Sequence, residues 1–358
     1  MPFTCKTIPA NINYQVNPLN LNVGPQFPRY AVLKNRCYTS WDGLPIQYDI
    51  VIPESASHVP LVIFIHGGGF LTGSKVHGFG TKYKPAIKAL LKNEIAYASI
   101  NYRLMGKNNE GAAETETLGI KKPLFDCVAA LQNFRSNAAV LKLDYDRMAF
   151  LGGSGGAGTA LWIALQGDMQ DTAATDFKKE STKVKAVVAF ETQSSYDKRI
   201  WANQLFNIAP NYFSLKCIKN IIETPRFRQY YYDASTPPLN NVSAIETAIQ
   251  NYLINNLDYK GSQFLNLDML NMVSPDSPPI WLESTKEVED FPNNNCVPTN
   301  REQMVHHPYH PNAVLQKLKL FPTLNYVARI NALGIFEQND PIDYTMKTYI
   351  QFLIDKLQ

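Results

Sequence analysis

The chain contains little charge. Asp, Glu, Lys and Arg make up 18% of its 358 residues, against roughly 25% in a typical soluble protein. The formal net charge is only +3, which argues against nucleic acid as a partner and against a long disordered tail.

Long apolar runs are also lacking: none approaches the about 20 residues that a membrane-spanning helix needs. Segment 1–24 has no charged start followed by an apolar stretch, so we expect no signal peptide and a cytoplasmic location, with export by another route left open.

Cysteine is also scarce. The five cysteines lack the Cys-x-x-Cys spacing of a thiolate zinc site. Their odd number and wide separation argue against a disulfide framework and favour a reducing compartment. We expect neither a metal nor another cofactor. The cysteines are Cys5, Cys37, Cys127, Cys217 and Cys296.

The remaining pattern is an alternation of strands and helices. Apolar runs bounded by turns predict strands, and several lack polar alternation, as strands buried on both faces do. The alternation predicts a mostly parallel sheet with helices on both faces, preceded by an antiparallel hairpin over residues 31–52. The predicted strands are 46–52, 61–65, 95–100, 147–151, 184–190, 280–282 and 324–330, and the helices are 83–92, 123–141, 154–166, 313–320 and 341–357. Asp340 is the expected N-cap of the last helix, with Pro341 in its first turn.

One long excursion interrupts this alternation. About ninety residues, rich in aromatic side chains, separate the strand that ends near Phe190 from the strand that begins at Ile280. They include a helical pattern over 244–257. So long a connection is typical of an inserted cap rather than a plain loop. We therefore predict one domain over 1–358 with a cap insertion at about 193–275.

A glycine-flanked serine follows one of the buried strands. Residues 152–156 read Gly-Gly-Ser-Gly-Gly, between an apolar strand and a helical segment. This is the strand, sharp turn and helix of a nucleophile elbow, in which glycines flank the serine because neighbouring backbones crowd the turn. Ser154 is therefore the predicted nucleophile.

A second glycine run ends the strand at 61–65. It reads HGGGF over 66–70, and its backbone N–H groups are suited to hold an oxyanion. We predict an oxyanion hole from Gly68, Gly69 and Gly155. A phosphate-binding loop is disfavoured because no Gly-Lys-Ser/Thr follows. His66, within the run, is expected to be structural rather than catalytic.

Together these motifs resemble a known family. HGGGF, NYRL at 101–104, FDCVAAL at 125–131 and DRMAFLGGSGGAG at 146–158 are similar to the hormone-sensitive-lipase and carboxylesterase-like branch of the α/β-hydrolase fold. The resemblance covers roughly residues 30–190. It implies an eight-stranded sheet, ester hydrolysis through an acyl-serine and a cap over the acyl pocket. It also implies that Arg103 and Asp126 are structural.

The catalytic carboxylate of that family follows a strand here represented by PPIWLE at 278–283. The next residues, STKEVEDF, offer Glu287 or Asp290 as the acid. Neither has the Gly-x-x-Asp setting usual in the family. Glu191, after the strand that ends at Phe190, either faces the serine or is a buried, paired carboxylate.

The expected histidine is missing. In the family it follows the last strand, but here Leu333 or Gly334 stands at that place, and none of the six histidines follows His310. The segment VHHPYHP at 305–311 belongs to the same rim of the sheet as the elbow. His306 or His307 is thus a candidate substitute base. A metal site is disfavoured because no carboxylate is interleaved and the prolines prevent a helical i, i+4 pair.

Two functions follow from these residues. The first is a serine hydrolase that acts on a small-molecule carboxylic ester through an acyl-serine. The alternative is a triad-deficient member of the fold, a pseudoenzyme that acts as a small-molecule receptor, an interaction protein or a non-hydrolytic catalyst. The chain is too short to add the propeller of a prolyl-oligopeptidase. Its oligomeric state and partner proteins cannot be inferred from these patterns.

Overall fold

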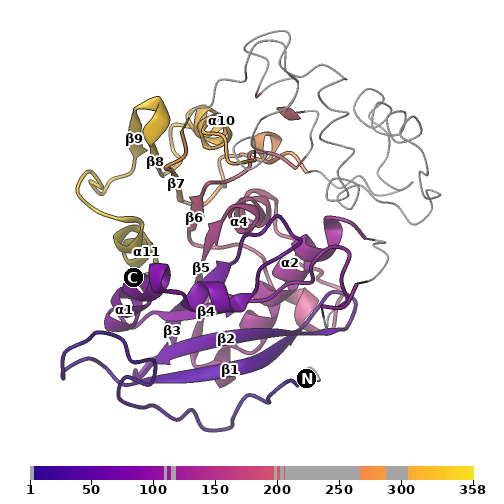
Figure 1. Ribbon diagram of the computed structural model, residues 1–358, viewed down its shortest axis with the longest axis vertical. Helices are drawn as coiled ribbons and strands as arrows, with labels where there is room; N and C mark the ends of the chain where they lie inside the picture. Colours follow the sequence, from indigo (N-terminus) through magenta and orange to yellow (C-terminus); the bar gives the residue numbers. More distant parts are fainter. Residues whose placement is uncertain are drawn as a thin grey trace.

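The computed structural model of the chain describes residues 4–108, 111–113, 118–196, 200–201, 205, 267–287 and 305–358. Its strands form one nine-stranded sheet in the order β1-β2-β4-β3-β5-β6-β7-β8-β9 (Figure 1). Neighbours from β4 to β8 are parallel, whereas β1, β2 and β9 pair antiparallel. The strands are β1 Tyr30–Thr39, β2 Pro45–Pro53, β3 Val59–Ile65, β4 Ala96–Ile100, β5 Leu143–Gly153, β6 Val187–Phe190, β7 Ile280–Ser284, β8 Tyr326–Ile330 and β9 Ile335–Asn339.

Helices cover both faces of the sheet. On one face lie α1 and α11, and on the other lie α2, α4 and α10 (Figure 1). Among the described helices, none has the length and apolar composition that crossing a membrane requires. The helices are α1 Lys84–Lys92, α2 Lys121–Ser136, α3 Ala138–Leu141, α4 Gly155–Leu165, α10 Tyr309–Leu318 and α11 Tyr349–Leu357, with short 3₁₀ turns at Lys75–Phe79, Thr81–Tyr83, Phe177–Lys179, Met269–Asn271 and Asn331–Leu333.

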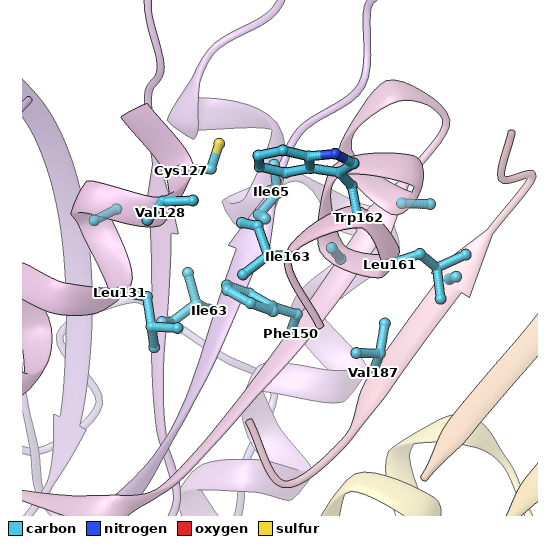
Figure 2. Packing of buried hydrophobic residues seen from close by; sticks show 14 of the residues in the cluster. Ile63, Ile65, Cys127, Val128, Leu131, Phe150, Leu161, Trp162, Ile163 and Val187 are labelled. Carbon is cyan, nitrogen blue, oxygen red and sulfur yellow. The ribbon is translucent and has the colours of Figure 1, made fainter. Parts of the chain in front are cut away.

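The core explains why the central strands read as continuous apolar runs. All seven residues of β3 are buried, and successive side chains enter opposite cores. Ile63 and Ile65 face α2 and α4, together with Phe150 of β5 (Figure 2). Val62 and Phe64 face the core that contains α1 and α11. The predicted parallel sheet with helices on both faces is confirmed, as is the opening hairpin β1–β2.

The C-terminal end differs from the prediction in two ways. The sheet has nine strands instead of eight, because residues 335–339 return as β9 along β8. The last helix begins at Tyr349 instead of residue 341, with Thr348 as its N-cap residue. Asp340 does not cap it. Its carboxylate instead accepts the Ile342 N–H at 3.0 Å in a turn and pairs with Lys356 at 2.8 Å.

The two ends of the long excursion meet. The Tyr196 N–H donates to the Leu267 carbonyl at 2.8 Å. Tyr196 and the apolar residues between Leu267 and Val273 pack into the main core. The predicted helix 244–257 and most of the predicted cap, 193–275, lie outside the described residues, so the cap stays a prediction.

Two of the cysteines are joined, contrary to the prediction. Cys5 and Cys37 form a disulfide across 32 residues of sequence. The N-terminal segment runs beside β1, with the Lys6 N–H donating to the Asn35 carbonyl at 2.9 Å, and this brings the two cysteines together. Cys127 is a buried free thiol. One disulfide therefore exists, although the spacing of the cysteines argued against a framework of them.

Candidate functional site

Ser154 occupies the turn between β5 and α4. Its backbone has φ +55° and ψ −126°, a combination that non-glycine residues rarely adopt. The Ser154 N–H donates to the Phe190 carbonyl at 2.8 Å, and its own carbonyl accepts the Ala157 and Gly158 N–H groups at 2.9 and 3.0 Å. These bonds hold the strained turn with the side chain half-buried. The predicted elbow geometry is present.

Close backbone approach explains the glycines around the serine. A Cβ atom on Gly152 would overlap the Gly156 carbonyl oxygen, and one on Gly156 would overlap the Ile65 carbonyl oxygen. By contrast, a Cβ atom on Gly155 would lie 3.6 Å from the Phe70 ring, an ordinary contact. Gly152 and Gly156 are therefore required by packing, as the crowding argument predicted.

The HGGGF run forms a turn beside the start of α4. Gly68 and Gly69 have φ values of +106° and +57°, and the Gly68 carbonyl accepts the Leu71 and Thr72 N–H groups at 3.1 and 3.2 Å. A Cβ atom on Gly155 would lie 3.7 Å from the Gly69 Cα atom, so the two loops are adjacent. Gly155 is the first residue of α4, where a backbone N–H has no partner within the helix.

Of the two candidate histidines, His306 reaches the serine. Its Nε2 atom lies 2.6 Å from Ser154 Oγ, within hydrogen-bond distance. His307 is buried, and its Nδ1 accepts the Tyr309 N–H at 3.2 Å. The structure therefore brings Ser154 together with His306 and directs His307 into the segment that begins α10.

The candidate carboxylates have different surroundings. Glu287 is exposed, and within the described ranges no hydrogen bond or ion pair joins it to His306. Asp290 lies outside the described residues. Glu191, at φ +49°, accepts the Thr285 N–H and Oγ1 at 2.8 and 2.9 Å and the Ser284 Oγ at 2.7 Å. It is thus a paired carboxylate that fixes the loop after β7.

His66 is enclosed by the fold. Its ring stacks on Tyr102 at 4.1 Å, and its Nδ1 lies 2.8 Å from the Gly67 carbonyl oxygen. Burial lowers the pKa of His66 to about 4, because the site disfavours the charged ring. A neutral Nδ1–H donor that fixes the glycine turn agrees with the structural role expected for it.

Arg103 and Asp126 form a buried ion pair. Arg103 Nε and Nη2 donate to the two Asp126 carboxylate oxygens at 2.9 and 2.7 Å, and its backbone N–H donates at 2.9 Å. Asp126 is fully buried. The pair joins the segment after β4 to α2, which agrees with the structural role that the resemblance implied.

The place of the missing histidine is a tight hairpin. Leu333 and Gly334 form the turn between β8 and β9, and Gly334 adopts φ +63°. The chain thus passes directly from β8 into an antiparallel strand instead of a rim loop that carries a base.

Two polar residues that the sequence patterns did not single out, Gln193 and Ser194, contact the histidine segment. The sequence signal that could have indicated them is their polar character directly after a buried strand.

Within the ranges that the structure describes, no cluster of His, Cys, Asp and Glu is arranged to hold a metal ion.

Residues 48–203 match the model of the BD-FAE family, a family of α/β-hydrolase esterases. The nine-stranded, mostly parallel sheet with helices on both faces matches the fold of such esterases. The chain has the α/β-hydrolase fold. The curated protein Gut esterase 1 of Caenorhabditis elegans is 28% identical over 149 residues, which are 40% of this chain and 25% of the worm protein. This match thus spans about a quarter of the length of that relative.

Solved structures share this fold. A bifunctional GH43-CE protein of Bacteroides eggerthii has a TM-score of 0.54 at 18% identity, over 91% of this chain and 38% of the other chain. A bacterial heroin esterase has a TM-score of 0.50 at 16% identity, over 96% of this chain and 88% of its own. At these identities the likeness shows the fold.

Proposed function

We propose that this α/β-hydrolase cleaves carboxylic esters of small molecules, with Ser154 as nucleophile and His306 as general base. The observation that carries the proposal is the 2.6 Å approach of His306 Nε2 to Ser154 Oγ. A serine hydroxyl is a weak nucleophile until a neighbouring base accepts its proton. The similarity to esterases supports an ester as the substrate.

The arrangement suits acyl transfer in two steps. His306 Nε2 takes the Ser154 proton as Oγ attacks the carbonyl carbon. The backbone N–H groups of Gly68, Gly69 and Gly155 stabilise the oxyanion that forms. The protonated His306 donates its proton to the departing alkoxide. The alcohol is released, and the acyl group stays on Ser154. His306 then deprotonates a water molecule, whose oxygen attacks the acyl carbon. The bond from that carbon to Ser154 Oγ breaks, the carboxylic acid leaves, and His306 returns its proton to Oγ.

The base needs a carboxylate to orient it, and Glu287 and Asp290 are the candidates. Glu287 is exposed and is not joined to His306 in the described structure. This favours Asp290 as the acid. The ion pair would form at His306 Nδ1, the ring nitrogen opposite the one that meets Ser154.

The test is turnover of p-nitrophenyl acetate and butyrate, with labelling by a fluorophosphonate probe. Wild-type protein is expected to hydrolyse both esters and to be labelled, whereas Ser154→Ala loses labelling and almost all turnover. Absence of turnover and labelling in folded wild-type protein overturns the proposal.

The missing C-terminal histidine favours the alternative, a triad-deficient binding protein. On that view the elbow and the glycine turn bind a ligand without cleaving it. Wild-type protein that is inactive, but whose melting temperature rises with an ester or carboxylic acid, would support this function.

A further inference from the structure

A buried polar segment follows β6. Thr192, Gln193, Ser194 and Ser195 are each at most 3% exposed, and Tyr196 is 2% exposed. Polar side chains are rarely buried to this extent unless they form hydrogen bonds, because an unsatisfied buried group is costly. The bonds of this segment therefore indicate what it holds in place.

Gln193 contacts the residue before the candidate base. Its side-chain Nε2 donates to the Val305 carbonyl at 2.9 Å, across 112 residues of sequence. Val305 directly precedes His306, so this bond fixes the backbone on the N-terminal side of the histidine.

Ser194 fixes the other side. Its backbone N–H and its Oγ lie 3.2 and 3.0 Å from His310 Nδ1. Because the backbone N–H can only donate, Nδ1 is the acceptor and the His310 proton is on Nε2. His310 is fully buried, and its ring lies 4.5 Å from that of Trp201. The backbone N–H of His310 donates to the His307 carbonyl at 3.0 Å. The segment from Val305 to His310 is thus held on both sides of His306.

The same segment contacts the helix of the nucleophile. The Tyr196 hydroxyl donates to the Gly155 carbonyl at 2.9 Å, next to Ser154. The Thr159 Oγ1 donates to the same carbonyl at 2.8 Å. Residues 193–196 therefore link the chain around Ser154 to the chain around His306.

We propose that Gln193 and Ser194 are positioning residues that hold the His306 segment against Ser154. The inference rests on the proposed function. In this chain the base lies on the connection between β7 and β8, so its place depends on side chains that reach it from the end of β6. A misplacement of about 1 Å at a catalytic group can cost roughly 10²-fold in rate.

The test replaces Gln193 by Met, which has a similar length but no N–H donor. Gln132→Met is the matched control, because Gln132 is also fully buried and its Nε2 donates to the Lys178 and Glu180 carbonyls at 3.0 and 2.8 Å, which do not belong to the segment that carries His306. We expect Gln193→Met to lower kcat about tenfold or more with little change in KM. Gln132→Met should lower the melting temperature by a similar amount and leave kcat unchanged.

Ser194→Ala is the second variant. It removes the Oγ contact and keeps the backbone contact to His310, so a smaller fall in kcat is expected. A kcat for Gln193→Met that equals the kcat of Gln132→Met overturns the positioning role. If Gln193→Met does not fold, an unchanged kcat in Ser194→Ala overturns it. An inactive wild type, or an active His306→Ala variant, instead contradicts the proposed function itself.

Discussion

His306 Nε2 and Ser154 Oγ meet at 2.6 Å across 152 residues of sequence. The histidine reaches the serine from the connection between β7 and β8, not from beyond β8. The order nucleophile, acid candidates, histidine along the chain is nevertheless the usual order of α/β-hydrolases. Under the proposed function, the base therefore lies on an earlier loop than in the family, while the order of the three groups along the chain is kept.

This contact predicts unequal roles for two adjacent histidines. His306→Ala should lower kcat by about 10⁴-fold or more, because removing the base of a serine hydrolase costs nearly as much as removing the nucleophile. His307→Ala should keep kcat within about tenfold of wild type, because its ring contacts Tyr309 and not Ser154. Steady-state kinetics on p-nitrophenyl butyrate measure both. Equal losses in the two variants would contradict the assignment of the base.

Two further variants distinguish between the acid candidates Asp290 and Glu287. Asp290→Asn should lower kcat by about 10³-fold or more while labelling of Ser154 slows, because an unoriented imidazole is a poor base. Glu287→Gln should be close to wild type, because Glu287 is exposed. Kinetics together with the rate of fluorophosphonate labelling decide between them. Full activity of Asp290→Asn would exclude Asp290 as the acid.

The two glycines after the nucleophile should differ in their tolerance of a methyl group. Gly156→Ala pushes a Cβ atom into the Ile65 carbonyl oxygen, so we expect a loss of about 3 kcal/mol in the free energy of unfolding. Gly155→Ala meets the Phe70 ring at 3.6 Å and keeps its N–H, and it should cost little. Chemical denaturation of both variants measures this difference, and equal stabilities would show that the turn is not as crowded as described.

His66 predicts a pH-dependent stability. Its pKa of about 4 in the fold lies below the unperturbed 6.5, so between these pH values the unfolded chain binds a proton at residue 66 that the folded chain does not. The free energy of unfolding should therefore fall by about 3 kcal/mol from this group as the pH is lowered from 6.5 to 4.

The comparison for this prediction is His66→Asn, whose amide can replace the Nδ1–H donor without titrating. Its stability should depend less on pH over that range than the stability of wild type. His58→Asn, at an exposed histidine, is the control and should leave the dependence unchanged. Denaturant titrations at several pH values supply the free energies, and parallel curves for wild type and His66→Asn would contradict the burial argument.

The sequence predicted the features that depend on local patterns. The apolar runs of β3 and β5 and the glycines around Ser154 are contiguous signals, so strand, turn and helix could be recognised together. The choice between His306 and His307 could not be made, because it depends on how the segment before α10 is held by Gln193 and Ser194 from another part of the chain. The Cys5–Cys37 pair was missed because it depends on the N-terminal segment lying beside β1.

The β8–β9 hairpin, which stands where the family has its histidine, also adds an edge strand to the sheet. β9 is the last strand, and the outer edge of such a strand exposes backbone groups that could pair with another chain. Polar side chains of β9 are engaged here: Gln338 Oε1 accepts the Tyr344 N–H at 3.0 Å, and Asn339 Nδ2 donates to the Pro322 and Leu324 carbonyls at 2.8 and 2.7 Å. Glu337 pairs with Lys319 at 2.7 Å. A short, polar border strand of this kind protects a sheet against edge-to-edge aggregation.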